Sequence, residues 1–152
     1  MVQLKRQYPG AILIGLDPDP GALRRGAIKA RRAGVEVHFE RGFSDQLPYR
    51  SASLDRVCCT FMLSLLPFDQ KLATLNEIRR VLRAGSFHLL DLVKRPRLQL
   101  HERLLRPRSQ FHLCSPKEMV ELMKLAGFQR PSVTGEYALR FWSLVSYVGY
   151  SR

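Results

Sequence analysis

The sequence predicts an α/β fold whose mostly parallel sheet ends in an antiparallel hairpin. Short apolar runs alternate with helix-like segments from residue 11 to residue 128, which is typical of parallel strands joined by crossover helices. The last two apolar segments, residues 132–137 and 142–150, are separated by only four residues. A link this short fits a hairpin and is too short for a parallel crossover.

The first strand is predicted over residues 11–16, after a short helix in residues 1–8. The acidic turn DPDP follows this strand, and a helix begins within the turn. Asp19 has the position of the helix N-cap, and Pro20 that of the first helical residue. Gly34 is placed to end this helix.

The second predicted strand covers residues 35–40, and a polar loop follows over residues 41–53. In residues 54–62, the residues after the charged pair Asp55 and Arg56 are strongly apolar. This composition is typical of a parallel strand that is covered on both faces.

Two further helices and one more strand complete the alternation. Asp69 is the expected cap of the first helix, which Gly85 would end, and the strand follows over residues 87–93. Ser115 begins a capping box with proline at the first helical position, and Gly127 would end that helix.

At 152 residues the chain has the length of one domain, and we expect a single domain over residues 1–152. The three cysteines lack the spacing of a zinc site, so no metal is expected. Cys58 and Cys59 are adjacent on a strand and should point to opposite faces. No apolar segment reaches the length of a transmembrane helix, and no secretory leader is visible, so we expect a cytoplasmic protein.

The chain is strongly basic, with a net charge of +12, and such a charge attracts polyanions in general. Residues 94–108 hold six Lys and Arg against one Glu. Nucleic-acid binding is one interpretation of this stretch. A solvated helix with inward-facing leucines is the favoured one, because no interleaved aromatic residues accompany the charge.

Asp17 directly follows the apolar run at residues 11–16. A carboxylate at the carboxyl end of a buried parallel strand can accept two hydrogen bonds from a ribose. The alternative is that Asp17 only shapes the turn before the helix.

Four segments in order resemble one known family: YPGAILIGLDPDPGAL, GFSDQLPYRSASLDRV, FMLSLLPFDQKLATLNEIRRVLRAG and SPKEMVELMKLAGF. Over residues 8–128 the chain is similar to class I methyltransferases, above all to the ubiquinone and menaquinone biosynthesis branch. The resemblance implies a Rossmann-like sheet, S-adenosylmethionine as cofactor and methyl transfer to a small-molecule acceptor.

The resemblance also implies residues that bind the cofactor. Asp17 would bind the ribose. Phe43 stands where the family has an aspartate for the adenine amino group, and its ring offers an apolar contact instead. Ser44 would present its backbone amide to the purine, while Asp45 is either a substitute acceptor or a turn residue.

Thr60 and Phe61 end the strand that passes under the transferred methyl group in the family. Ser64 and Leu65 occupy the positions of a histidine pair that many relatives carry, and Asp91 has either a substrate-facing or a structural role. No catalytic acid or base is predicted. The sulfonium donor brings its own leaving group, so orienting the reactants is the main requirement.

The family's first strand and glycine-rich turn have no counterpart in this sequence. The resemblance therefore implies a partial domain, truncated at its N-terminus. Without the missing strand, either two apolar strands pair in a new register or two strand edges stay open, and we expect the chain alone to bind the cofactor weakly or not at all. A truncated gene model and a fragment of a split gene are two explanations. Two functional alternatives stay open: a non-catalytic interaction module whose partner chain supplies the missing strand, and an RNA-binding or RNA-modifying methyltransferase.

Overall fold

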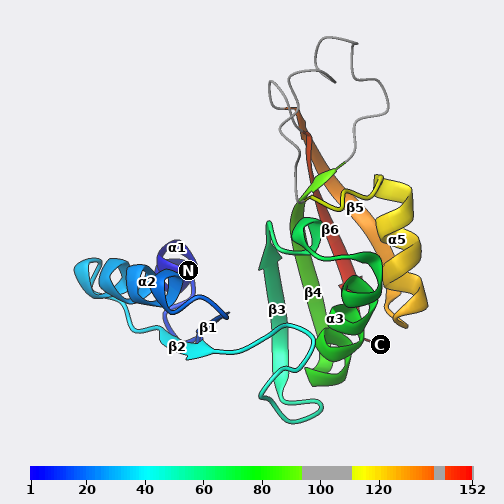
Figure 1. The fold of residues 1–152 in the computed structure, drawn as a ribbon. Coiled ribbons are helices and arrows are strands. Elements are labelled where there is room, and N and C mark those ends of the chain that lie inside the picture. Colours follow the sequence, from blue (N-terminus) through cyan, green and yellow to red (C-terminus); the bar gives the residue numbers. More distant parts are fainter. Residues whose placement is uncertain (94–110, 139–142, 152) are drawn as a thin grey trace. The chain divides into compact units, whose positions relative to one another are not determined.

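The computed structural model describes residues 1–93, 111–138 and 143–151 (Figure 1). They belong to two compact units, Met1–Pro48 and Tyr49–Arg152. The whole of the predicted basic stretch, residues 94–108, lies outside the described residues. None of the helices in the described part is long and apolar enough to cross a membrane.

The first unit is a βαβ unit preceded by a short helix. Its elements are α1 (Val2–Gln7), β1 (Ile14–Asp17), α2 (Pro20–Arg32) and β2 (His38–Arg41). β1 and β2 pair in parallel, with Ile14 opposite His38 and Asp17 opposite Arg41, and α2 packs on both strands. The predicted parallel strand–helix–strand order is therefore confirmed here.

Both strands of this unit begin three residues later than predicted, at Ile14 and His38 instead of residues 11 and 35, because hydrogen bonds within the preceding turns compete with the sheet. Ala11 donates its N–H to the Tyr8 carbonyl at 3.1 Å and accepts from the Lys5 ammonium at 2.6 Å, so it belongs to a turn. Val35 donates to the Ala30 carbonyl at 3.1 Å. This bond closes a Schellman motif at the end of α2 and delays β2.

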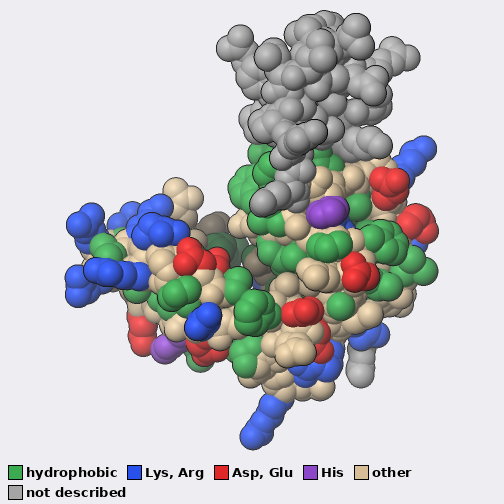
Figure 2. Space-filling model, in the orientation of Figure 1, with side chains coloured by type: hydrophobic (Ala, Val, Ile, Leu, Met, Phe, Trp, Pro, Cys, Tyr) green, Lys and Arg blue, Asp and Glu red, His purple; other side chains and the backbone are tan. Residues whose placement is uncertain are grey.

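Both ends of α2 are built as predicted. The Asp19 carboxylate accepts from the N–H groups of Gly21 at 2.8 Å and Ala22 at 3.0 Å, which caps the helix. Gly34 has a φ of +64°, a left-handed conformation that glycine adopts without strain. Figure 2 shows Lys and Arg side chains gathered over this helix.

The second unit is a four-stranded mixed sheet in the order β3-β4-β6-β5. Its elements are β3 (Leu54–Thr60), a 3-10 turn η1 (Leu63–Leu65), α3 (Phe68–Val81), β4 (Leu82–Val93), α5 (Pro116–Leu125), β5 (Gln129–Ala138) and β6 (Ser143–Tyr150). β3 and β4 are parallel, whereas β6 is antiparallel to both β4 and β5. The predicted C-terminal antiparallel hairpin is confirmed, and its last strand inserts beside β4.

The core of this unit lies between one face of the sheet and the helices α3 and α5 (Figure 1). Phe87 and Leu89 of β4 are fully buried on this face, and Cys59 stands opposite Leu89 in the neighbouring strand. Cys58 and Thr60, which alternate with Cys59, are exposed. Because both helices pack on the same side, the second unit by itself covers one face of this strand.

Two details around α3 differ from the sequence prediction. Pro67 is the N-cap residue, and Asp69 lies inside the first turn without capping the helix. Gly85 does not end α3, because the helix passes directly into β4 at Leu82. Gly85 instead lies close to the backbone of β3, since a Cβ there would lie 2.0 Å from the Asp55 carbonyl oxygen.

The start and end signals of α5 are confirmed. Ser115 Oγ accepts from the Glu118 N–H at 3.3 Å, and the Glu118 carboxylate accepts from the Ser115 N–H at 2.7 Å. This pair is the predicted capping box. Gly127 follows the helix with a φ of +83°.

β1 and β3 belong to different sheets. Within the described strands, β1 bonds to β2 and β3 bonds to β4, and each has no second neighbour. Within its own unit, each of these two strands therefore has one edge without a described strand partner.

Candidate functional site

Asp17 is the last residue of β1 and is half-buried. Its Oδ1 atom accepts from the Asp19 N–H at 2.8 Å, so the carboxylate shapes the turn before α2. Within the described residues its Oδ2 atom accepts no hydrogen bond. The turn role and a ligand role are thus compatible, because each uses a different oxygen.

A tight turn follows β2 beside Asp17. Gly42 donates its N–H to the Asp17 carbonyl at 3.4 Å, and Gln46 donates to the Phe43 carbonyl at 3.3 Å. Ser44 and Asp45 are the two central residues of the turn that this second bond closes. Parallel pairing thus brings Asp17, Ser44 and Asp45 together at the carboxyl ends of two strands.

The surface of this turn suits an adenosine group. Phe43 is 60% exposed, so its ring is free to make an apolar contact, and Asp45 is exposed beside it. A ribose diol needs an acceptor such as Asp17 Oδ2, and a purine needs an apolar surface and amide groups at its edge. The residues present therefore fit the adenosine end of S-adenosylmethionine.

Thr60 and Phe61 lie together in the second unit, where β3 ends. Thr60 is exposed, and Phe61 donates its N–H to the Leu90 carbonyl at 3.0 Å. Phe61 has a φ of +54°, which is uncommon for a bulky residue and costs about 1–3 kcal/mol. The chain turns sharply here and leaves the ring 46% exposed.

Asp91, in the neighbouring strand β4, is hydrogen-bonded to the backbone just after this turn. Its side chain is buried, with the residue 1% exposed. Oδ2 accepts from the Ser64 N–H at 2.9 Å, and Oδ1 accepts from the Leu92 N–H at 2.7 Å. Of the two roles considered for Asp91, the geometry favours the structural one.

Lys71 of α3 is a second buried anchor, and the sequence analysis missed it. Its ammonium group donates to the Leu66 carbonyl and, at 2.6 Å, to the His112 carbonyl. Burial lowers the pKa of Lys71. Its position four residues before Leu75 and seven before Ile78 puts it on the buried stripe of the helix, which is the signal that could have identified it.

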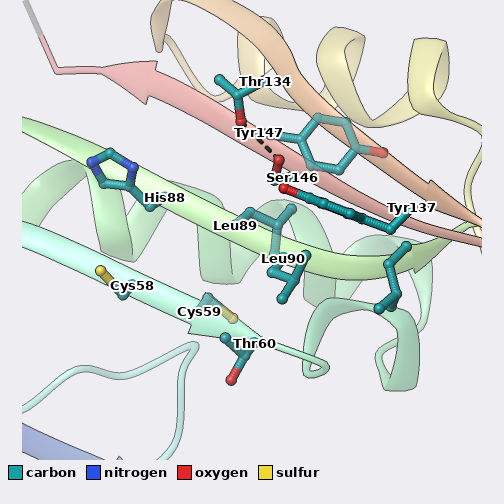
Figure 3. Close-up of a pocket in the computed structure, with 11 residues that line it drawn as sticks. Cys58, Cys59, Thr60, His88, Leu89, Leu90, Thr134, Tyr137, Ser146 and Tyr147 are labelled. Carbon is teal, nitrogen blue, oxygen red and sulfur yellow. Dashed lines mark hydrogen bonds between the residues drawn. The ribbon is translucent and has the colours of Figure 1, made fainter. Parts of the chain in front are cut away.

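A hollow of about 530 Å³ lies on the second unit (Figure 3). Thr60 lines it, and Thr134 donates a hydrogen bond to Ser146 at 2.9 Å within it. The lining residues are Cys58, Cys59, Thr60, His88, Leu89, Leu90, Thr134, Tyr137, Leu144, Ser146 and Tyr147. Of the five predicted site residues, this hollow contains Thr60 alone.

The cysteine side chains are poor nucleophiles in this structure. Partial desolvation raises the pKa of Cys58 and of Cys114, and the burial of Cys59 raises its pKa to about 12. Thiolate chemistry at neutral pH is therefore disfavoured. No cluster of three or more His, Cys, Asp or Glu side chains that could hold a metal ion is present in the described part of the chain.

The sequence matches known methyltransferases. Residues 1–85 match the family described as "Methyltransferase domain". A demethylmenaquinone methyltransferase of Deinococcus radiodurans is 34% identical over 86 residues, which are 56% of this chain and 34% of the relative. A Mycobacterium bovis protein of uncharacterized function is 29% identical over 85 residues, 56% of this chain and 30% of the relative. The chain thus spans about a third of the length of the curated relatives that it matches.

Solved structures share the fold. A methyltransferase of Methanosarcina mazei described as S-adenosylmethionine-dependent superposes with a TM-score of 0.77 at 18% identity, covering 97% of this chain and 86% of its own. A Thermotoga maritima protein described as a possible histamine N-methyltransferase gives a TM-score of 0.73 at 21% identity, with coverage of 99% and 75%. The chain therefore belongs to the methyltransferase domain family and has the Rossmann-like fold of its S-adenosylmethionine-dependent enzymes.

Proposed function

We propose that this chain binds S-adenosylmethionine through Asp17, Ser44 and Asp45 and serves in methyl transfer to a small-molecule acceptor. One observation carries the proposal. Asp17 has an oxygen that accepts no hydrogen bond within the described residues, beside the turn that exposes Phe43. This is the arrangement expected of a ribose acceptor next to a purine contact.

Each residue has a distinct part in holding the cofactor. Asp17 Oδ2 accepts from the ribose hydroxyl groups, Phe43 packs against the adenine ring, and the Ser44 amide donates to the purine edge. Asp45 is a second acceptor for the base. Thr60 and Phe61 belong to the second unit, and their role at the methyl end of the cofactor stays a prediction from the resemblance. When bound, S-adenosylmethionine supplies a methyl group on a positively charged sulfur.

The thiols and Asp91 are poorly suited to act as a general base, which favours a methyl acceptor that is already nucleophilic. Burial keeps the thiols protonated, and the buried Asp91 is committed to backbone groups. A quinol-type ring is electron-rich and needs orientation more than a strong base. We therefore propose a quinone-like ring as the acceptor class, which agrees with the name of the Deinococcus radiodurans relative. A cytoplasmic location stays a prediction from the sequence.

Photo-crosslinking with methyl-labelled S-adenosylmethionine, followed by tryptic mapping, tests cofactor binding. We expect label in the peptide GFSDQLPYR, residues 42–50, which contains the turn after β2. Asp17→Asn should reduce the labelling strongly, whereas Glu36→Gln, which removes an exposed carboxylate from the same unit, should leave it unchanged. The absence of label from this peptide would overturn the cofactor site.

A second assay separates binding from catalysis. Transfer of the labelled methyl group to a 1,4-naphthoquinol is expected if the chain is an enzyme with a quinone-like acceptor. Cofactor binding without transfer to quinol, phenol or RNA acceptors would instead support the non-catalytic module. Transfer to RNA alone would replace the small-molecule acceptor by the second alternative.

A further inference from the structure

The helix α2 carries an unusual concentration of positive charge. Its 13 residues include five Arg or Lys and no Asp or Glu. All five basic residues are exposed, and they are Arg24, Arg25, Lys29, Arg31 and Arg32. Figure 2 shows the resulting cluster of basic side chains over this helix.

These five side chains share one side of the helix. At 3.6 residues per turn they fall within an arc of about 160°. The buried Ala30 and the half-buried Leu23 lie on the opposite side, where α2 packs on β1 and β2. Arg24 and Arg32 are about 12 Å apart along the helix axis. The result is a continuous cationic strip.

The first unit neutralises little of this charge. Arg25 pairs with Asp19 at 3.3 Å, and both partners are exposed. Arg24, Lys29, Arg31 and Arg32 have no ion pair or side-chain hydrogen bond within the described residues. Arg25 and Lys29 also stand four residues apart, a spacing at which like charges destabilise a helix.

The helix dipole explains only part of the pattern. Cations in the last turn, such as Arg31 and Arg32, interact favourably with the carboxyl end of a helix. Arg24 and Arg25 lie in the first half, where the dipole gives cations no such benefit. An external anion would relieve the repulsion along the whole strip.

We propose that the cationic strip of α2 binds the phosphate backbone of a nucleic acid. This inference is independent of methyl transfer. A phosphate backbone presents regularly spaced negative charges that match a strip about 12 Å long. A lipid surface fits less well, because α2 has no Trp or Phe, and its Leu23 side is packed against the strands. Residues 94–108, which the sequence analysis considered, are not needed for this surface.

Fluorescence anisotropy with a labelled 20-nucleotide single-stranded RNA tests the proposal on the whole chain between 50 and 200 mM KCl. The variant combines Arg24→Gln, Lys29→Gln and Arg32→Gln. The matched control removes three exposed charges from the second unit by Arg50→Gln, Lys117→Gln and Lys124→Gln. Circular dichroism verifies that both variants keep their helices.

We expect the α2 variant to bind at least tenfold more weakly at 100 mM salt and the control less than threefold. The slope of log affinity against log salt should become shallower by about 2 in the α2 variant, since single strands release about 0.7 counterion per contact. Equal losses in both variants, an unchanged α2 variant, or no RNA binding by the original chain at 50 mM salt would overturn the proposal. If the α2 variant lost binding to phosphatidylserine vesicles while its RNA affinity was unchanged, the surface would be a lipid-binding one instead.

Discussion

The carboxylate of Asp91 accepts a hydrogen bond from the backbone N–H of Ser64 at 2.9 Å, so a residue of β4 holds the turn that follows β3. This turn begins with Thr60 and Phe61, two residues that the sequence resemblance predicts to contact the cofactor. The bond is buried and joins positions 27 residues apart.

Replacing Asp91 should destabilise the protein. Asp91→Ala leaves the buried N–H of Ser64 and that of Leu92 without their acceptors, and each lost bond costs about 1–3 kcal/mol. Asp91→Asn keeps one acceptor oxygen, so its free energy of unfolding should fall by less. Urea denaturation measures the difference, with Asp69→Ala as the exposed control in the first turn of α3. An Asp91→Ala variant no less stable than this control would contradict the role given to the carboxylate.

Lys71→Met should be destabilising although methionine matches lysine in length and is apolar. The substitution removes the donor to the carbonyl groups of Leu66 and His112, and we expect a loss of about 2 kcal/mol or more. Lys124→Met is the control, because Lys124 is exposed and forms an exposed ion pair with Glu121. A higher melting temperature for Lys71→Met than for the original chain would contradict this expectation. It would show that the two hydrogen bonds of the ammonium group contribute less free energy than its desolvation costs.

Gly85→Ala should disturb the pairing of β3 with β4. The added methyl group would lie 2.0 Å from the Asp55 carbonyl oxygen, so the backbone has to shift, at a cost of about 1–3 kcal/mol. Gly10→Ala is the matched control, since a Cβ there meets no atom within 4 Å. Chemical denaturation of both variants gives the comparison, and equal stabilities would show that the strands are farther apart than described.

The Cys59 thiol should make the protein less stable at alkaline pH. Burial raises its pKa from 9.0 to about 12, so the folded state keeps a proton that the unfolded state releases. The contribution of the protonated thiol to the free energy of unfolding is therefore fully present below about pH 9. It is lost as the pH rises toward about 12, at roughly 1.4 kcal/mol per pH unit.

The free energy of unfolding, followed between about pH 8 and pH 10.5, measures this effect. Cys59→Ala should show a smaller alkaline loss than the original chain, whereas Cys58→Ala, at an exposed position, should resemble the original chain more closely. Parallel pH profiles of the original chain and Cys59→Ala would show that the thiol titrates normally in the folded state.

Local signals made much of the fold predictable from the sequence. The caps at Asp19 and Ser115 and the glycine at position 34 follow rules that involve only a few neighbouring residues. The strand starts at residues 11 and 35 were wrong, because backbone bonds within neighbouring turns compete with the sheet. The composition of these segments does not reveal which bond forms.

Contacts between distant residues were the hardest part to predict. Lys71 bonds to a carbonyl 41 residues away, and Asp91 bonds to an N–H 27 residues away. Such partners are fixed by tertiary packing. The roles expected of Asp17 and of residues 43–45 came from the resemblance to the family, and the parallel pairing of β1 with β2 brings their carboxyl ends to one edge.

Binding of the cofactor at Asp17 is tested most directly by an NMR titration of the isotope-labelled chain with S-adenosylmethionine up to millimolar concentration. We expect saturable shifts of the backbone amides of Asp17, Gly42 and Phe43. Asp17→Asn can keep the bond from the Asp19 N–H yet loses the charged acceptor, so it should raise the dissociation constant about tenfold or more. Glu36→Gln should titrate like the original chain. Unchanged affinity of Asp17→Asn, or shifts confined to other parts of the chain, would contradict the proposed ribose contact.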